Sequence, residues 1–139
     1  MDREILFRGQ TRKKGEKVRL DGSPIDSNWV YGGIFPNNKG GDFAIIYQQE
    51  PTIEKFTVYA DTVGQYTGKN DKNGTKIFEG DIVILRFNPC VVKWDTDNAC
   101  YAFYQNGITK MSGFNADTMK LLEVIGNIHD DSDLLEVSE

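Results

Sequence analysis

The stretch Val63–Leu85 constrains the fold more than any other, because turn-forming residues there interrupt short runs of strand composition. Asn73-Gly74 predicts a tight type I′ hairpin turn, since both residue types tolerate positive φ angles. Glu79-Gly80-Asp81 is a second turn signal, and the β-branched run Ile82–Leu85 after it is typical of a buried strand. The region therefore predicts closely spaced antiparallel strands.

Similar alternation of turn signals and short strand-like runs covers the rest of the chain. We expect strands at Ile5–Phe7, Lys17–Leu20, Trp29–Phe35, Phe43–Tyr47, Phe56–Tyr59, Cys90–Trp94, Ala99–Tyr104 and Leu121–Ile128, and a basic loop at Gly9–Lys17. Only Asp117–Glu123 and Ser132–Val137 invite a helical interpretation, and both are short. The pattern predicts a mainly β protein: a small barrel or sandwich of short antiparallel strands, an SH3-like barrel included, with one or two short helical turns.

Two strand details carry specific expectations. Gly32-Gly33 inside a strand predicts a bulge or a close backbone approach, which we favour over a ligand cradle. A hairpin turn at Asp95–Asn98 would place Trp94 opposite Ala99 and Cys90 opposite Phe103. Cys90 and Cys100 would then lie on opposite faces, so we expect two reduced thiols rather than a disulfide.

The length of 139 residues fits one domain. We expect a single domain over 1–139, with an N-terminal strand and loop lobe at about 1–60 and a C-terminal β-barrel core at about 61–139. The first residues are charged and lack a signal-peptide core, and no apolar run approaches the ~20 residues of a membrane helix. The expected location is the cytoplasm, away from membranes.

Catalytic and metal-binding patterns are missing. His129 is the only histidine, so neither a triad nor a Cys/His zinc site assembles from the two cysteines. Aligning Gly74 on the invariant glycine of a calcium loop puts Lys69 and Gly80 at ligand positions, which excludes that motif. We therefore expect no enzyme activity, no cofactor and no metal.

Nucleic-acid binding is the one functional class with a positive signal. Basic residues near the N-terminus are suited to phosphates: Arg12, Lys13, Lys14, Lys17 and Arg19. Exposed aromatic residues of a barrel, such as Trp29, Tyr31 and Tyr66, would stack bases. The chain is nevertheless acidic, with a net charge of −5 and a pI near 4.9, opposite to the usual nucleic-acid footprint. A nucleic-acid-binding β-barrel is therefore the alternative hypothesis.

Several motifs in order resemble the YopX family, small proteins of phages and prophages whose biochemical role is not established. They are Arg3–Gly9, Trp29–Gly32, Thr62–Gly68, Asp71–Gly74, Ile77–Val83, Val124–Ile128 and Leu134-Leu135. Lys69 and His129 depart from the residue types common in the family at those places. The resemblance implies a phage or prophage gene, a product in the cytoplasm of the host bacterial cell, and self-association. It transfers no catalytic residue to this chain.

Most of the shared residues are glycines, turn formers and core apolar residues, but three are polar or aromatic residues at a turn. Tyr66, Thr67 and Asp71 either tie this loop together or contact a partner, and we take them as a candidate contact loop. The leading hypothesis is a non-enzymatic protein-interaction or assembly module. Its partners are further copies of itself and a phage or host protein.

Overall fold

The computed structural model describes residues 4–15, 20–21, 26–35, 41–48, 52–85 and 87–135. The chain divides into two compact units, Met1–Gln65 (unit 1) and Tyr66–Glu139 (unit 2), which are described separately. The expected organisation of one domain with two lobes stays a prediction.

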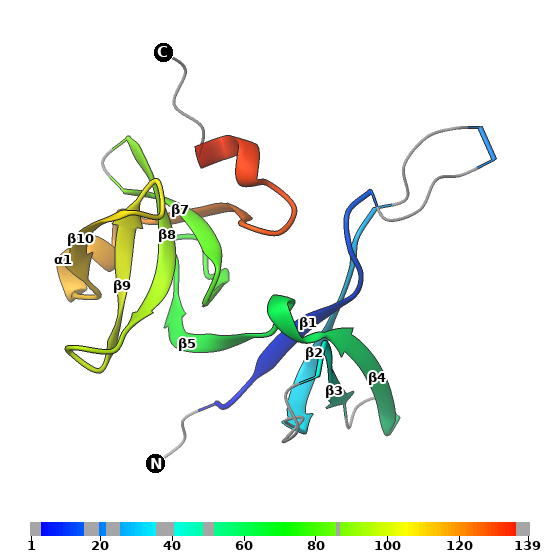
Figure 1. Cartoon of the computed structure of the whole chain (residues 1–139). Coiled ribbons are helices and arrows are strands. Elements are labelled where there is room, and N and C mark those ends of the chain that lie inside the picture. Colours follow the sequence, from blue (N-terminus) through cyan, green and yellow to red (C-terminus); the bar gives the residue numbers. More distant parts are fainter. Residues whose placement is uncertain are drawn as a thin grey trace. The chain divides into compact units, whose positions relative to one another are not determined.

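Unit 1 is an open antiparallel sheet with strand order β4-β3-β2-β1-β5 (Figure 1). Its elements are β1 (Phe7–Arg12), β2 (Asn28–Phe35), β3 (Phe43–Gln48), β4 (Glu54–Tyr59), the 3-10 turn η1 (Ala60–Thr62) and the start of β5 (Gly64–Asn70). Among the described strands no ladder joins β4 to β1, so the expected barrel does not close.

Strand β1 extends into residues for which the sequence predicted a loop. Val30, Ala44, Ile46 and Val58 form the core of unit 1, and β1 crosses it. A Cβ atom on Gly9 would lie 2.8 Å from Val58 Cγ2, so glycine lets the strand run close to β4. The loop prediction from Gly9 onward is therefore wrong as far as β1 extends.

The second expected strand, Lys17–Leu20, falls mostly outside the described residues, and Leu20 itself lies in a turn. The glycine pair in β2 behaves as predicted, because a Cβ atom on Gly32 would lie 2.0 Å from the backbone carbonyl oxygen of Tyr47. No side chain fits at that distance from a neighbouring backbone. Close approach is the reason for glycine at this position.

Unit 2 is built on a second antiparallel sheet of order β10-β9-β8-β7-β11, shown in yellow, green and orange in Figure 1. Its elements are β6 (Lys76–Phe78), which pairs with β5, then β7 (Asp81–Leu85), β8 (Asn88–Asp95), β9 (Cys100–Gln105), β10 (Thr109–Gly113), α1 (Ala116–Met119), β11 (Glu123–Asn127) and η2 (Ser132–Leu135). This confirms a mainly β fold with only short helical turns. The second sheet is also open within the described part of the chain, so the predicted C-terminal barrel is a sheet instead.

The core of unit 2 contains more buried residues than that of unit 1 within the described parts of both. Its buried residues are Ile77, Val83, Leu85, Cys90, Val92, Phe103 and Leu122. Phe103 is fully buried, and its ring stacks on that of Phe114 at 4.4 Å. Strand β7 is buried as its β-branched composition predicted.

The β8–β9 hairpin corrects the predicted register. Trp94 pairs with Tyr101 and Cys90 with Gln105, because the turn spans four residues after Asp95 and ends at Ala99 with φ 51°. The pairing differs by two residues from the expectation, and a shift of two leaves every side chain on its expected face. Cys90 and Cys100 are therefore on opposite faces, and both are free thiols, as predicted.

Candidate functional site

The predicted contact loop is held by its own side chains. Tyr66 is buried, its ring centroid lies 5.6 Å from that of Phe78, and its hydroxyl donates to Asn70 Oδ1. The Thr67 hydroxyl donates to the carbonyl of Ile77 at 2.8 Å, across the β5–β6 pair. Both side chains thus fix the strands that frame the turn.

Asp71 organises the turn itself. Its Oδ1 accepts the backbone N–H groups of Asn73 (2.8 Å) and Thr75 (2.9 Å). Its Oδ2 accepts the N–H of Val124 at 2.9 Å. Of the Asn-Gly pair only Gly74 has a positive φ, 82°, so the type I′ prediction is wrong. The carboxylate makes an Asx-type turn that needs one left-handed residue instead of two.

The pKa of Asp71 lies below its usual value. Burial alone would raise the pKa, but the backbone hydrogen bonds from Val124, Thr75 and Asn73 favour the ionised form and outweigh it. The hydrogen bonds of the Asp71 carboxylate therefore stabilise this turn within unit 2. Contact of this loop with a partner stays a prediction, and the described side chains give it no added support.

The described basic residues near the N-terminus are partly engaged. Arg12 Nε donates to the Asp26 carbonyl at 2.9 Å. Lys13 Nζ forms an ion pair with Asp61 Oδ2 at 3.0 Å, and Lys14 is exposed. The other two predicted contacts, Lys17 and Arg19, lie outside the described residues.

The predicted aromatic partners of nucleic acid also fall into two groups. In unit 1, Tyr31 is exposed, and the guanidinium of Arg8 lies 4.6 Å from the ring centroid of Trp29. Tyr66, in unit 2, is buried. The structure therefore does not present the three rings as one stacking surface.

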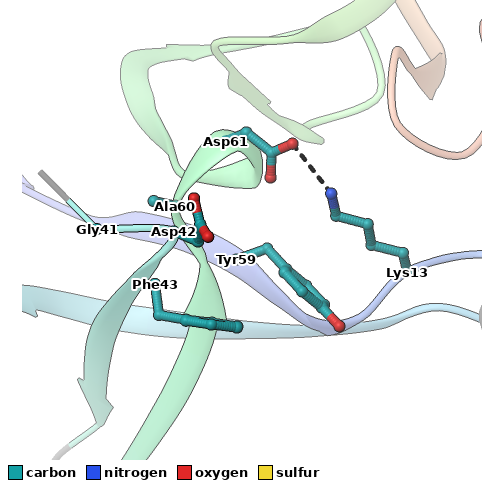
Figure 2. Close-up of a pocket in the computed structure, with 7 residues that line it drawn as sticks. All are labelled: Lys13, Gly41, Asp42, Phe43, Tyr59, Ala60 and Asp61. Atoms are coloured by element: carbon teal, nitrogen blue, oxygen red, sulfur yellow. Dashed lines mark hydrogen bonds and ion pairs between the residues drawn. The ribbon is translucent and has the colours of Figure 1, made fainter.

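Lys13 lines an open cleft in unit 1 that the sequence pattern did not predict. Figure 2 shows the cleft, in which Lys13 reaches toward Asp61 beside the ring of Tyr59. It has a volume of about 610 Å³ and is lined by Lys13, Gly41, Asp42, Phe43, Tyr59, Ala60 and Asp61. We call it the unit 1 cleft.

Strand pairing brings the cleft's aromatic residues together. Phe43 opens β3 and Tyr59 closes β4, and the two are direct cross-strand partners with ring centroids 5.3 Å apart. The Ala60 N–H donates to the Asp42 carbonyl at 2.8 Å and extends this pairing by one bond. The ammonium of Lys13 then lies 4.6 Å from the centre of the Tyr59 ring, a cation–π contact.

The 3-10 turn behind the cleft is fixed by one hydroxyl. Thr62 is buried, and its Oγ1 donates to the Tyr59 carbonyl at 2.7 Å while it accepts the Gln10 N–H at 2.8 Å. This ties η1 to β1 and sets the position of Asp61 at the cleft rim. The sequence offered no signal for the cleft, because Phe43, Tyr59 and Asp61 meet only through the β3–β4 register.

An apolar surface on β2 and β3 continues from the aromatic pair. Phe35 is the cross-strand partner of Ile45, and Phe43 lies two residues before Ile45 in β3, on the same face. These side chains are 51%, 38% and 48% exposed for Phe35, Ile45 and Phe43. We call the three residues the outer apolar face.

His129 lies in a tight turn of unit 2, where its backbone N–H donates to Asn127 Oδ1 at 2.9 Å. Over the described ranges, no group of three or more histidine, cysteine or acidic side chains is arranged to hold a metal ion. Within the same ranges, no helix has the length and apolarity to cross a membrane.

Comparison with known proteins gives one assignment. None of the curated proteins matches the sequence. The model of the YopX family, described as "YopX protein", matches residues 26–136, which include the unit 1 cleft from Gly41 onward and the Val63–Leu85 region. The match covers most of the chain, and the chain therefore belongs to the YopX family.

Proposed function

We propose that this protein is a non-enzymatic protein-interaction module that associates with itself and serves a phage or prophage in the cytoplasm of a bacterial host. The outer apolar face carries the proposal. Phe35, Ile45 and Phe43 are large apolar side chains gathered on one side of one sheet, and such a cluster on a protein surface marks an interaction site.

A second copy of the chain suits this face, because an isologous interface places the same patch on both partners. Two patches dominated by Phe35, Phe43 and Ile45 bury apolar area on each side without leaving a charge unpaired at the centre. Self-association also follows from the family resemblance.

Light scattering and sedimentation of the purified protein at tens of micromolar test this proposal. We expect a dimer or larger species, and Ile45→Lys should shift it to monomer because it buries a charge in the interface. Ile108→Lys, at a strongly exposed site in unit 2, is the matched control and should leave the species unchanged. A monomeric wild-type protein, or equal behaviour of both variants, would contradict the proposal.

Nucleic-acid binding is the second candidate, supported by the ammonium of Lys13 over the Tyr59 ring. Protein binding is better supported, since Asp61 already pairs with Lys13 and a second acid, Asp42, lies in the same cleft. The nucleic-acid hypothesis predicts retention on single-stranded DNA or RNA that weakens with salt and is lost when Lys13, Lys14 and Lys17 are neutralised. No retention at low salt would eliminate it.

A further inference from the structure

We propose that the unit 1 cleft binds an extended, proline-rich peptide segment of a partner protein, with a basic residue of that segment placed at Asp42 and Asp61. The inference rests on the proposed role in protein interaction and names the kind of partner. It concerns a different surface from the outer apolar face, apart from Phe43, which borders both.

The aromatic side chains favour proline. Phe43 and Tyr59 line the cleft with two tilted rings, with an angle of 36° between their planes. Proline rings pack against aromatic faces, and a proline-rich segment is extended before it binds, so little conformational entropy is lost. The cleft volume of about 610 Å³ lies within the range of ligand sites, about 300–1,000 Å³.

The backbone between β3 and β4 offers no place for an inserted β-strand. Phe43 and Tyr59 already pair with each other, and the next donor, the Ala60 N–H, bonds to the Asp42 carbonyl. An added strand could pair only with the outer edge of β4, which stands at the end of the strand order. A polyproline II segment needs no ladder, because its backbone groups remain open to solvent.

The charge of the cleft lining favours a basic residue on the bound peptide. The cleft contains two carboxylates, Asp42 and Asp61, and one ammonium, Lys13, which pairs with Asp61. The lining is therefore negative by one charge. An arginine on the ligand fits best, since its guanidinium bonds carboxylates in a bidentate manner and also stacks on aromatic rings.

Titration of the full-length, ¹⁵N-labelled protein with synthetic peptides tests the proposal. The first peptide, of about nine residues, is rich in proline and carries one arginine; the second replaces arginine by glutamate, and the third replaces the prolines by glycine and serine. We expect the first to shift the amide signals of Lys13, Asp42, Tyr59 and Asp61, and to bind at least about tenfold more tightly than the other two.

Charge variants locate the site. Asp42→Asn with Asp61→Asn should weaken the first peptide about tenfold, whereas Glu54→Gln, at the exposed start of β4, should change nothing. No amide shifts at about 1 mM peptide, or equal binding of all three peptides, would overturn the inference. Unaltered affinity in the double variant would overturn the placement of the basic residue.

Failure here is distinct from failure of the proposed function, because the oligomeric state is measured without peptide. Self-association lost in Ile45→Lys together with no peptide binding would remove the peptide inference and keep the homo-oligomer. A monomeric protein that binds the first peptide at the cleft would remove the homo-oligomer and keep the peptide inference.

Discussion

The two units use their polar and aromatic residues in opposite ways. Among its described residues, unit 2 buries the acids Asp71, Asp81 and Asp95, and each accepts hydrogen bonds from the backbone of its own turn. Unit 1 has a smaller core and leaves Phe35 and Phe43 about half exposed beside a charged cleft. The buried acids of unit 2 stabilise its turns, whereas the exposed rings and charges of unit 1 are available for binding.

Because of this difference, the most recognisable motif and the best candidate site lie in different units of the chain. Tyr66 and Asp71, which belong to the motifs that carry the family resemblance, serve hydrogen bonds inside unit 2. The cleft and the outer apolar face are formed by residues whose pattern is ordinary for strands. A recognisable motif can therefore be required for the formation of a turn rather than for a binding surface.

The largest expected effect contrasts two phenylalanines. Phe103→Ala should lower the free energy of unfolding by about 3–5 kcal/mol, because it leaves a cavity at a fully buried stacked ring. Phe43→Ala should lower it by less than about 1 kcal/mol, since that ring is half exposed. Urea denaturation measures both, and equal losses would break the distinction between the units.

Removal of the Asp71 carboxylate should come next. Asp71→Ala takes the acceptor from three backbone N–H groups, with an expected loss of about 2–4 kcal/mol in the free energy of unfolding. Asp71→Asn keeps an acceptor oxygen and should cost less. The exposed neighbour of a similar turn, Asp97→Ala, is the control for loss of an acid and should be nearly neutral. A neutral Asp71→Ala would show that the turn forms without its carboxylate.

Acid should weaken unit 2 in a defined pH window. The Asn98 side chain and the Lys110 ammonium lower the pKa of Asp95 from 3.8 to about 2, and the pKa of Asp71 is also lowered. A depressed folded-state pKa gives stability that is complete above the unfolded value and is lost as pH falls through the folded value. The contribution of these two acids to stability should therefore be complete well above pH 3.8 and fall as the pH drops toward 2.

The fluorescence of Trp94 follows this change in a Trp29→Phe background. Trp94 is then the only tryptophan, and it lies in unit 2, so the signal reports the unfolding of that unit. Asp95→Asn should flatten the decline. An undiminished decline in that variant would assign the acid sensitivity to other carboxylates.

The smallest effect concerns a strained loop in unit 2. Phe87, between β7 and β8, has φ 74° and is 96% exposed, so its side chain gains no burial for a backbone angle that asparagine tolerates better. Phe87→Asn should raise the free energy of unfolding by up to about 1 kcal/mol, measured by urea denaturation. A loss of stability would instead reveal a contact of this ring that its exposure conceals.

Local composition predicted the central strands well and predicted the pairing poorly. Runs such as Phe43–Tyr47 and Ile82–Leu85 matched β3 and β7, because β-branched and aromatic residues favour a buried pleated surface. β10 was missed, since Thr-Lys-Met-Ser-Gly has no apolar alternation and forms a strand by pairing with β9. Propensity alone carries no information about such a partner.

The candidate site depended even more on long-range geometry. Gly9 is in a strand because Val58 lies against it, and Lys13 meets Asp61 across 48 residues of sequence. The sequence leaves the role of Asp71 open between turn formation and partner contact for a similar reason, because one of its three donors, Val124, lies 53 residues away. Local patterns predict turns, whereas contacts of this range need the fold.

The bond between Asp71 and Val124 also has a consequence for the folding kinetics. A contact that spans 53 residues closes a long loop, and the loss of chain entropy must be compensated by many other contacts forming with it. The carboxylate of Asp71 in the β5–β6 turn gains its third hydrogen bond only when β11 is in place. Protection of the Val124 amide against hydrogen exchange should therefore report complete opening of unit 2 rather than local fraying.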